Sequence, residues 1–555
     1  MKKLFFMLMM VVGVTLCHAQ APNWIWGKLT GTSINLIGVK STALDEANNV
    51  YTSGVYQPSA FFDSSSFTAT NTASYLLKYN SDGVFQWVKS NGGNSINVVP
   101  GIITVDTHNN IIVSGKFEGN IITFDSDTLV NSGTWAPYLA KYDSLGNVIW
   151  AKTFNANAGI SAATTDSFDN IYITGYYYGD TVVIGNDTLF NLPSMYNYFI
   201  AKLDASGNFL WARGAKGDYG ISYGVDLKSD PNGNVYLTGL YSMINQTSQA
   251  LIIGHDSLST LGTYDDIFIA KYNSNGCAAW GRRIGNVSSD FTSSIAINHS
   301  GKIFVCGKYE SPEMIVGTDS LHNAYSYNSC FPSSGYIMEF DTSGVAIWAK
   351  SSTGTPGILA NCVSTDNNGN SYITAGTGHA TGGSISFGSL QIPLVGNEPT
   401  AIFCFDSLGT TKWAKSLSEG GGMCAISVAN NGDVFVGGNF LFHHLIIGTD
   451  TLSSNITALF GAKLSYFEGQ GISELQTPNS AFTLYPNPTS GIITIESTSA
   501  KLTSIKIMNV LGECVYQSEI RNSKSEINLT GVSKGIYFLQ ANTAAGIVNK
   551  KIMVE

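Results

Sequence analysis

The feature that most constrains this chain of 555 residues is a phrase that recurs along most of its length. An apolar segment, usually with lysine near its end, is followed nine residues later by tryptophan. Four copies keep the lysine and two keep only the spacing: Lys78/Trp87, Lys141/Trp150, Lys202/Trp211, Lys271/Trp280, Glu339/Trp348 and Cys404/Trp413. Self-similarity at a fixed period restricts a chain to repeat architectures, so the repeat decides the fold.

A second phrase lies between successive tryptophans. It reads Val-Tyr-x-Thr-Gly or a close variant and occurs at residues 49–54, 110–115, 170–175, 234–239, 302–307, 370–376 and 433–438. Its alternation of β-branched or aromatic residues with small residues predicts strands. Asp, Asn and Gly between the segments, as in residues 143–147 and 204–208, predict tight hairpin turns. One period therefore predicts a four-stranded antiparallel sheet, and many copies add a hairpin such as residues 184–189 or 447–452.

The two ends of the repeat complement each other. The segment 459–463 ends in lysine but has no tryptophan after it, whereas Trp26 has no such segment before it. Sheets arranged radially form a β-propeller. We therefore predict an all-β fold with a seven-bladed propeller over residues 20–465. Its tryptophan strands lie outermost, and the N-terminal segment 23–27 closes the last blade.

The repeat resembles a known family. Val-Tyr-x-Thr-Gly followed by F-I-A-K-Y-D-x-x-G-N-x-x-W-A-K is similar to the bacterial beta-propeller repeat often called SBBP, over roughly residues 22–465. Members of that family are largely secreted, so the resemblance implies a fold and an extracellular setting more than an activity. Glu339 and Cys404 depart from the pattern where it has lysine, which indicates that the lysine is not essential to folding.

The first nineteen residues are predicted to be a signal peptide. Lys2 and Lys3 precede an apolar run over residues 4–16, and the small Ala19 stands before the expected cleavage site. Cys17 raises a lipoprotein anchor as the alternative, although Leu16 is bulky for a lipobox. The run is short for a membrane span, which needs about 20 residues, and no later transmembrane segment is predicted.

After the repeat, residues 466–481 are predicted to be a linker and residues 482–555 a small Ig-like β-sandwich of short alternating strands. The motifs Y-P-N-P-T-S-G, I-x-I-M-N-x-L-G and G-I-Y-F-L resemble the type A C-terminal sorting domain of the Bacteroidetes type IX secretion system. The resemblance implies a set of sorting residues: Pro486, Asn487, Pro488, Gly491, Gly512, Gly535 and Lys551. It further implies contact with the type IX machinery, export, removal of the tail, and release or attachment at the surface. An ordinary Ig-like module is the alternative.

Charge and motif content argue against several functions. Only 12% of residues are charged and the net formal charge is −10, which argues against nucleic-acid binding. Gly220 to Gly224 matches G-x-S-x-G but lacks the strand-to-helix context of a nucleophile elbow. No zinc motif is present, and no cofactor is predicted. The Asp-Asn-Gly turns resemble calcium loops, so structural calcium is an alternative, but their recurrence at hairpins favours turns.

Residues outside the repeat register are the better candidates for function. Trp135, Tyr176 and Tyr178, and the loop with Glu310 and Glu313, are predicted binding loops, since aromatic rings beside carboxylates suit glycan or peptide capture. The sequence thus predicts a monomeric, secreted, non-enzymatic protein that binds a protein or glycan ligand. One alternative is a polysaccharide hydrolase or lyase, with Glu310 and Glu313 as an acid and base pair. Another is a structural component of the surface layer.

Overall fold

The fold is all-β over the residues that the computed structural model describes, and these contain no helix. They are residues 21–465 and 482–555, except 92–96, 155–156, 192–194, 216–219, 244–249, 261–263, 324–332, 356, 378–381, 397–398, 418–421, 441–443, 498–501, 510–513, 520–523 and 544–545. The chain divides into two compact units, Met1–Phe467 and Glu468–Glu555. The predicted signal peptide, the linker and Gly512 lie outside the described residues.

Seven sheets of the first unit share one antiparallel plan in its described part. The first sheet consists of β2 (Leu36–Leu44), β3 (Val50–Gln57), β6 (Ala73–Tyr79) and β7 (Phe85–Asn91). The second consists of β8 (Val98–Pro100), β9 (Thr104–Val105), β10 (Ile111–Glu118), β13 (Trp135–Tyr142) and β14 (Val148–Lys152). The third consists of β15 (Ala158–Thr165), β16 (Ile171–Tyr178), β19 (Tyr196–Leu203) and β20 (Phe209–Gly214).

The next three sheets continue the plan in chain order. The fourth sheet contains β21 (Ile221–Ser229), β22 (Val235–Ser242), β25 (Asp266–Tyr272) and β26 (Ala278–Ile284). The fifth contains β27 (Asp290–Ile297), β28 (Ile303–Tyr309), β31 (Ser334–Phe340) and β32 (Ala346–Gly354). The sixth contains β33 (Ile358–Thr365), β34 (Ser371–Thr377), β37 (Thr400–Phe405) and β38 (Thr411–Ser416). The last contains β39 (Gly422–Val428), β40 (Val434–Phe440), β43 (Thr457–Leu464) and, from the other end of the chain, β1 (Trp24–Ser33).

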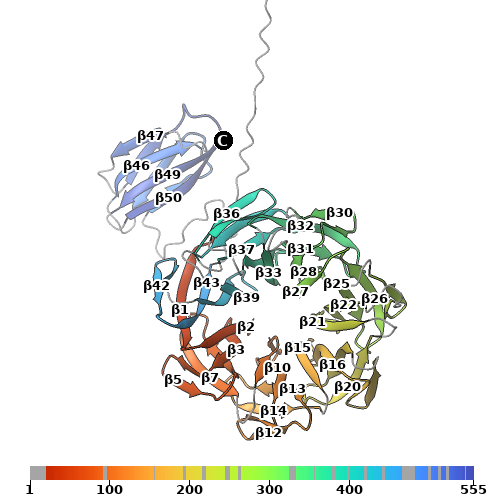
Figure 1. The fold of residues 1–555 in the computed structure, drawn as a ribbon. Coiled ribbons are helices and arrows are strands. Elements are labelled where there is room, and N and C mark those ends of the chain that lie inside the picture. The colour runs from red at the N-terminus through yellow and green to blue at the C-terminus, as the bar shows by residue number, and fades with distance from the viewer. Residues whose placement is uncertain are drawn as a thin grey trace, which may run out of the picture. The chain divides into compact units, whose positions relative to one another are not determined.

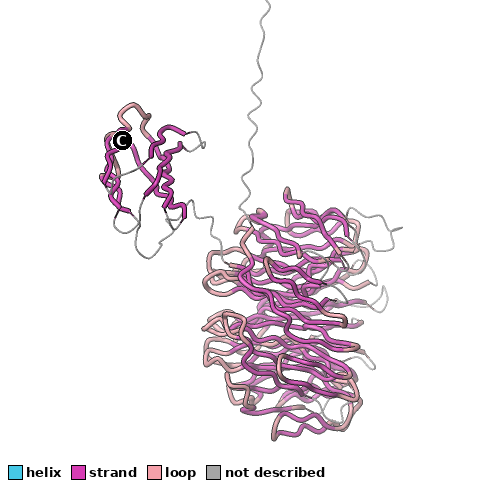
Figure 2. The backbone as a smooth tube through the Cα atoms, turned by 90° about the vertical axis from the view of Figure 1, so that its left-hand side faces the viewer, coloured by secondary structure: helices cyan, strands magenta, loops and turns pink. Residues whose placement is uncertain are grey.

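The sheets stand around a common centre, as in a β-propeller (Figure 1). The first strand of each sheet, such as β15 or β21, faces the centre, and the tryptophan strand, such as β20 or β26, lies at the outside. In the view from the side the strands run between two faces of the ring (Figure 2). We call the face with the turns after the first and third strands the turn face, and the opposite face the hairpin face.

The N-terminal strand completes the last sheet. β1 pairs with β43 in antiparallel register, so that Trp26 lies opposite Lys463. This is the same relation that Trp87 has to Lys78 within the first sheet. The pairing predicted from the two incomplete ends of the repeat is therefore confirmed.

The additional hairpins mostly form small sheets of their own. They are β11 (Ile121–Phe124) with β12 (Asp127–Val130), β17 (Thr181–Ile184) with β18 (Asp187–Phe190), β23 (Leu251–Ile253) with β24 (Asp256–Leu258), β29 (Glu313–Val316) with β30 (Asp319–His322), and β41 (His444–Ile447) with β42 (Asp450–Ser453). The Asp187 carboxylate accepts a hydrogen bond from the backbone N–H of Ala212 on outer strand β20. Asp127, Asp256, Asp319 and Asp450 do the same for their outer strands. These aspartates occupy donors on strand edges that would otherwise invite pairing with another chain.

Two hairpins instead extend a neighbouring sheet. β4 (Ser59–Phe62) pairs with β1, and β5 (Ser65–Thr68) pairs with β4. Likewise β35 (Gly382–Phe387) pairs with β32, followed by β36 (Leu390–Val395). In both cases a hairpin from one repeat is joined to the outer strand of the preceding sheet. The closing strand β1 is thus held by β43 on one side, by β4 near its end, and by Asp450.

The core lies between adjacent sheets, and the recurring tryptophan connects them. The Trp348 ring packs against the turn glycine Gly409 of the following sheet, where a Cβ would meet ring atoms at 2.6 Å. Gly409 has a φ of +73°, which favours glycine because it has no Cβ. Five further pairs repeat the contact: Trp26/Gly83, Trp87/Gly146, Trp150/Gly207, Trp211/Gly276 and Trp280/Gly344. The spacing of lysine and tryptophan in the sequence therefore reflects a contact between one sheet and the next.

The second unit contains two antiparallel sheets with one shared core. The sheets are β44 (Phe482–Tyr485), β45 (Ile492–Ser497) and β48 (Lys524–Asn528), and β47 (Cys514–Glu519), β46 (Leu502–Asn509), β49 (Gly535–Thr543) and β50 (Gly546–Val554). Ile493 and Ile527 of the first sheet and Ile507, Leu539 and Ile552 of the second belong to the same buried cluster. Alternating strands that bury one face in this way are the pattern expected of a small sandwich.

Candidate functional site

The turn face is built from one hydrogen-bonded unit that recurs. In the third sheet, Asp166 accepts hydrogen bonds from the backbone N–H groups of Phe168 and Asn170 and from the hydroxyl of Tyr172. The ammonium group of Lys202 lies 3.8 Å from the same carboxylate and 4.9 Å from the centre of the Tyr172 ring. Burial and the neighbouring Asp166 charge raise the pKa of Tyr172 above its ordinary value. The turn aspartates are therefore occupied by structural bonds, which explains why they recur.

One group on the turn face has the composition of a metal site. Ligand atoms of Asp106, His108 and Asp169 lie within 4.8 Å of one another. Each is already engaged, because His108 Nδ1 lies 2.5 Å from Asp169 Oδ2, and Asp106 accepts two backbone N–H groups and pairs with Lys141 at 2.7 Å. The geometry is that of two interlocked turns, whose ligand atoms already have partners among the described residues.

The hairpin face brings three of the predicted binding residues together. Trp135 is the first residue of β13, and Tyr176 and Tyr178 lie at the end of β16 in the next sheet. The centres of the Trp135 and Tyr178 rings are nevertheless only 6.5 Å apart. Tyr196 joins them, with its ring centre 5.0 Å from Tyr178 and 5.8 Å from Tyr176. Tyr223 of β21 completes the group, 5.4 Å from both Tyr176 and Tyr196. We call these five residues the aromatic patch, and it spans three successive sheets.

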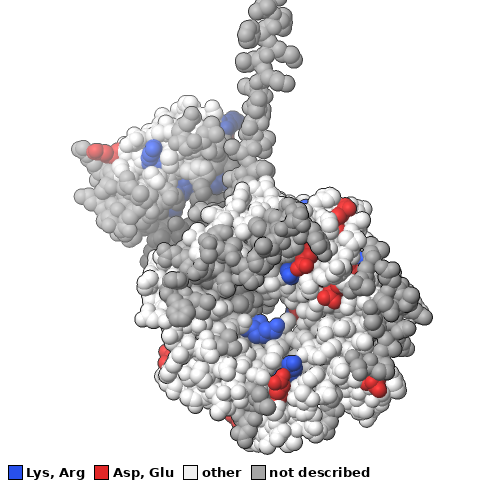
Figure 3. All heavy atoms as spheres, in the orientation of Figure 1, with Lys and Arg blue, Asp and Glu red and all other residues white. Residues whose placement is uncertain are grey.

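The patch is partly open to solvent and has a cation at its edge. Tyr178 is exposed, and the other four rings are half-buried. The ammonium group of Lys116 lies 5.3 Å from the Trp135 ring centre and 5.8 Å from that of Tyr176. Burial, together with Tyr196 and Asp265, raises the pKa of Tyr223 to about 12. Charged side chains are sparse among the described residues on the face of the ring seen in Figure 3.

Glu310 and Glu313 each have a local partner instead of each other. Glu310 forms an ion pair with Lys308 at 2.8 Å. Glu313, at the start of β29, accepts a hydrogen bond from Ser320 and lies 4.0 Å from His322. Carboxylates occupied in this way are poorly placed to act as an acid and base pair, so the geometry gives no support to that role.

A buried carboxylate pair, which no sequence motif indicates, lies between the fourth and fifth sheets. Asp266 and Asp290 are 1% and 0% exposed. Arg283 Nε donates to Asp266 Oδ2 at 2.7 Å, whereas Asp266 Oδ1 has no hydrogen-bond partner in the described structure. Burial raises the pKa of Asp266 to about 7, and the neighbouring Asp290 contributes to the rise. Perturbed carboxylates are common at active sites, but a side chain this buried cannot reach a substrate.

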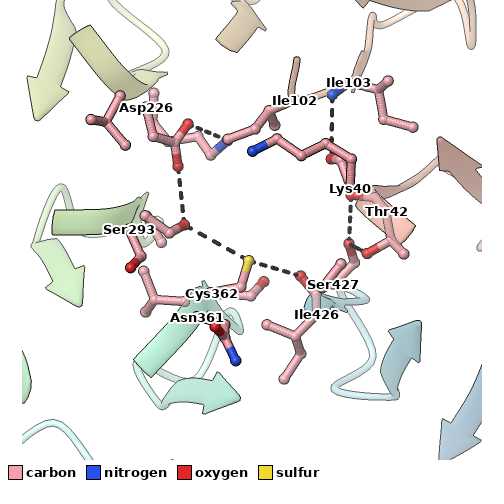
Figure 4. Close-up of a pocket in the computed structure, with 18 of the residues that line it drawn as sticks. Lys40, Thr42, Ile102, Ile103, Asp226, Ser293, Asn361, Cys362, Ile426 and Ser427 are labelled. Carbon is pink, nitrogen blue, oxygen red and sulfur yellow. Dashed lines mark hydrogen bonds and ion pairs between the residues drawn. The ribbon is translucent and has the colours of Figure 1, made fainter. Parts of the chain in front are cut away.

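The centre of the ring contains a cavity of about 580 Å³. Its lining comes from the innermost strands and includes Lys40, Thr42, Asp226, Ser293, Asn361 and Cys362, several of which are labelled in Figure 4. The Asp226 carboxylate is 1% exposed and accepts hydrogen bonds from Ser294 Oγ and the Ile295 N–H, each at 3.0 Å, on the adjacent strand. Asp226 is the one carboxylate among the described lining residues.

The predicted sorting residues connect the first and last strands of the second unit. Asn487 Nδ2 donates to the Lys551 carbonyl at 2.7 Å, and Asn487 Oδ1 accepts from the Met553 N–H at 2.9 Å. Gly491 has a φ of +131°, and a Cβ there would meet Thr530 at 2.8 Å. Pro486 and Pro488 flank Asn487, and Gly535 pairs with Val554 of β50. The opening motif therefore positions the C-terminal strand of this unit.

Comparison with known proteins gives a family for the second unit. Residues 483–555 match the secretion system C-terminal sorting domain. An uncharacterized WD repeat-containing protein of Acanthamoeba polyphaga mimivirus is 26% identical over 503 residues, covering 75% of this chain and 36% of the relative. The chain thus spans about a third of the length of that curated relative.

Solved structures with some similarity include two further proteins. The Pan2 WD40 domain of Neurospora crassa is 10% identical with a TM-score of 0.36, covering 80% of this chain and 97% of that one. A chain of the mitotic checkpoint complex is 9% identical with a TM-score of 0.40, covering 84% and 99%. The propeller assignment for this chain comes from its own sheet topology.

The ring and the C-terminal unit together define a class, that of exported β-propeller proteins with a sorting tail. No helix in the described part has the length and apolar character needed to cross a membrane. The tail is the sorting domain of the type IX secretion system, so this protein is exported to the cell surface or the extracellular space.

Proposed function

We propose that this protein is a non-enzymatic, glycan-binding propeller of the cell exterior, and that the aromatic patch is its binding surface. The observation that carries the proposal is the unbroken set of ring contacts from Trp135 through Tyr178, Tyr196 and Tyr176 to Tyr223. Rings held in this way present a wide, rigid apolar surface with hydroxyl groups at its edge. Such a surface suits the apolar faces and hydroxyl groups of sugar rings.

The architecture proposed for the mature protein follows the sequence prediction. We infer a seven-bladed ring, in which β1 is the outer strand of the seventh blade, and an Ig-like sandwich for the tail. The support is the shared plan of the seven sheets and the two-sheet core of the second unit. We further propose that residues 1–19 and the tail from residue 482 are removed, leaving a monomeric propeller that is released or attached to the surface.

Binding is favoured over catalysis by the placement of the acidic groups. Glu310 and Glu313 are held in local pairs, and Asp226 accepts bonds from the next strand. A polysaccharide hydrolase of the usual kind would need two carboxylates facing the substrate, about 5–9.5 Å apart. A purely structural role would leave the exposed Tyr178 and the cation at Lys116 without a function.

A glycan array probed with the full chain tests the proposal. We expect binding that Tyr178→Ala and Trp135→Ala each weaken by about tenfold or more, since stacked aromatic residues dominate interfaces of this kind. Phe168→Ala is the matched control, because Phe168 is 72% exposed and lies on the turn face. A blank array, or equal loss with the control, would contradict glycan binding. Turnover of a glycoside would favour the enzyme alternative.

A further inference from the structure

Most of the innermost strands share one irregularity in their backbone pairing. Six of them have a register shift of one residue against the second strand of their sheet, at the same place in each repeat. The residues skipped by the pairing are Lys40, Ser161, Val225, Ser293, Asn361 and Cys424. A β-bulge leaves one residue outside the ladder and re-aims its side chain.

The bulge recurs, but the residue at it does not. Lys40, Val225, Ser293 and Asn361 all line the central cavity, where they supply a cation, an apolar group, a hydroxyl and an amide. A feature needed only for folding would be expected to keep one residue type, as the tryptophans and turn aspartates do. Variable side chains on a constant frame are the arrangement by which rigid scaffolds present binding groups.

The positively and negatively charged side chains that line the central cavity are unequal in number. Lys40 is exposed to the cavity, and within the described residues it makes no hydrogen bond or ion pair. Figure 4 shows its side chain extending across the pocket toward the side where Asp226 lies. Lys228 is 3.7 Å from Asp226, whose oxygens already accept N–H and O–H donors. Two ammonium groups therefore face the cavity against one satisfied carboxylate.

At the turn face the ring is lined by acidic residues instead. A second hollow of about 390 Å³ is lined there by Asp45, Glu46, Asp106, Asp166 and Asp230, and its described lining includes no lysine or arginine. Asp106 and Asp166 are paired with Lys141 and Lys202, so the uncompensated positive charge lies at the level of Lys40. Low-dielectric walls focus the field of such lining charges, which favours binding of an anion at that level.

We propose that the central cavity binds a small molecule with a carboxylate, sulfate or phosphate group, held by Lys40 and Lys228, with Ser293 and Asn361 contacting its uncharged part. The cavity volume of about 580 Å³ suits a ligand of one or two sugar rings. This site is distinct from the aromatic patch, and binding at either one is measured independently of the other.

Isothermal titration calorimetry on the full chain tests the proposal with three probes: inorganic sulfate, inorganic phosphate and glucuronate. Glucose serves as the uncharged counterpart of glucuronate. We expect at least one anion to bind, with affinity that falls as sodium chloride is added. Lys40→Gln should weaken binding by about tenfold or more, because hydrogen bonds to charged groups are the strong ones. Lys40→Arg, which keeps the charge, should retain most of the affinity.

The controls separate binding from folding. Lys350→Gln changes a lysine on outer strand β32 and should leave binding unchanged. Lys40 has no partner to lose among the residues that the structure describes, so the melting temperature of Lys40→Gln without ligand should equal that of the parent protein, while the anion-induced increase disappears. The proposal is overturned if no probe binds at millimolar concentration, if glucose binds as well as glucuronate, or if Lys40→Gln and Lys350→Gln behave alike.

Discussion

The two faces of the ring use their polar and aromatic residues differently. On the turn face, the same aspartate, tyrosine, lysine and tryptophan return in successive sheets, and each is engaged with its own or the next sheet. On the hairpin face, Trp135, Tyr178 and Tyr223 occur at positions where other repeats have different residues. Groups that build the ring have no capacity left for a ligand, so binding is expected where the repeat is broken.

The largest expected effect comes from removing the closing strand β1, because the contacts that join the last sheet to the first are then lost. Deletion of residues 20–30 removes most of β1, and with it the partner of β43 and the Trp26 contact to Gly83. We expect the melting temperature to fall by more than about 10 °C, because two edges become exposed and a core between sheets is opened. Calorimetry measures this, with deletion of residues 468–555 as the control. An unchanged transition after the first deletion would refute closure by β1.

The recurring buried ion pair should contribute more to the free energy of unfolding than an ion pair at the surface. Lys141 and Asp106 are 2.7 Å apart, with side chains 6% and 0% exposed. Lys141→Met should reduce the free energy of unfolding by about 3–5 kcal/mol, because it leaves a buried charge without its partner. Lys89→Met, which breaks the exposed pair with Asp125, should cost less than about 1 kcal/mol. Chemical denaturation of both variants gives the comparison, and similar costs would mean that the recurring lysine has no special role.

The contact between tryptophan and glycine predicts a position-specific cost. Gly409→Ala places a Cβ against the Trp348 ring at a φ of +73°, so we expect a loss of about 2–4 kcal/mol in unfolding free energy. Gly38→Ala is the matched control, since a Cβ there would meet nothing within 4 Å. Denaturant titration should show a difference of at least about 1 kcal/mol between the variants. Equal effects would show that the glycine is not required by packing.

The smallest expected effect is the contribution of Asp266, on the hairpin face, to the pH dependence of the free energy of unfolding. The pKa of Asp266 is raised to about 7 in the folded protein, above its value in the unfolded chain. The folded state therefore holds this proton more tightly, so the stabilisation is complete at low pH and is lost as the pH rises through about 7. Asp266→Asn should reduce the fall in unfolding free energy between pH 5 and pH 8 by about 1–3 kcal/mol. Thermal unfolding across this range measures it, and an unaltered pH profile would refute the assignment.

The fold could be largely predicted because each recurring residue has a partner at a fixed sequence distance. Trp26 and Lys463 are predicted to pair because the six other tryptophans of the repeat each have their strand partner nine residues earlier. The role of the additional hairpins could not be predicted in this way. Asp187 reaches the N–H of Ala212, and β4 of the first repeat joins β1, the outer strand of the preceding sheet. Both contacts depend on how a hairpin folds back over a sheet, which periodicity does not encode.

The candidate sites were predicted only in part. Trp135, Tyr176 and Tyr178 were identified because they lie outside the repeat register, but Tyr196 and Tyr223 were missed. Tyr196 lies directly opposite Tyr178 in the ladder, so the register of that hairpin would have indicated it. Lys40 was missed because a bulge removes it from the alternation of its strand. A one-residue shift reverses which face a side chain takes, and a sequence pattern cannot locate such a shift.

The closure by β1 has a consequence for how the ring forms. The hydrogen bond between Gly27 and Asp450 joins residues 423 positions apart, and almost the whole propeller must be made before it can form. Contacts of such separation form late, since the entropy of closing a long loop must be overcome first. Until then the incomplete seventh sheet presents an open edge to other chains. A circular permutant that places β1 directly after β43 would turn this late encounter into a local hairpin, and the interval in which the chain can aggregate would shorten.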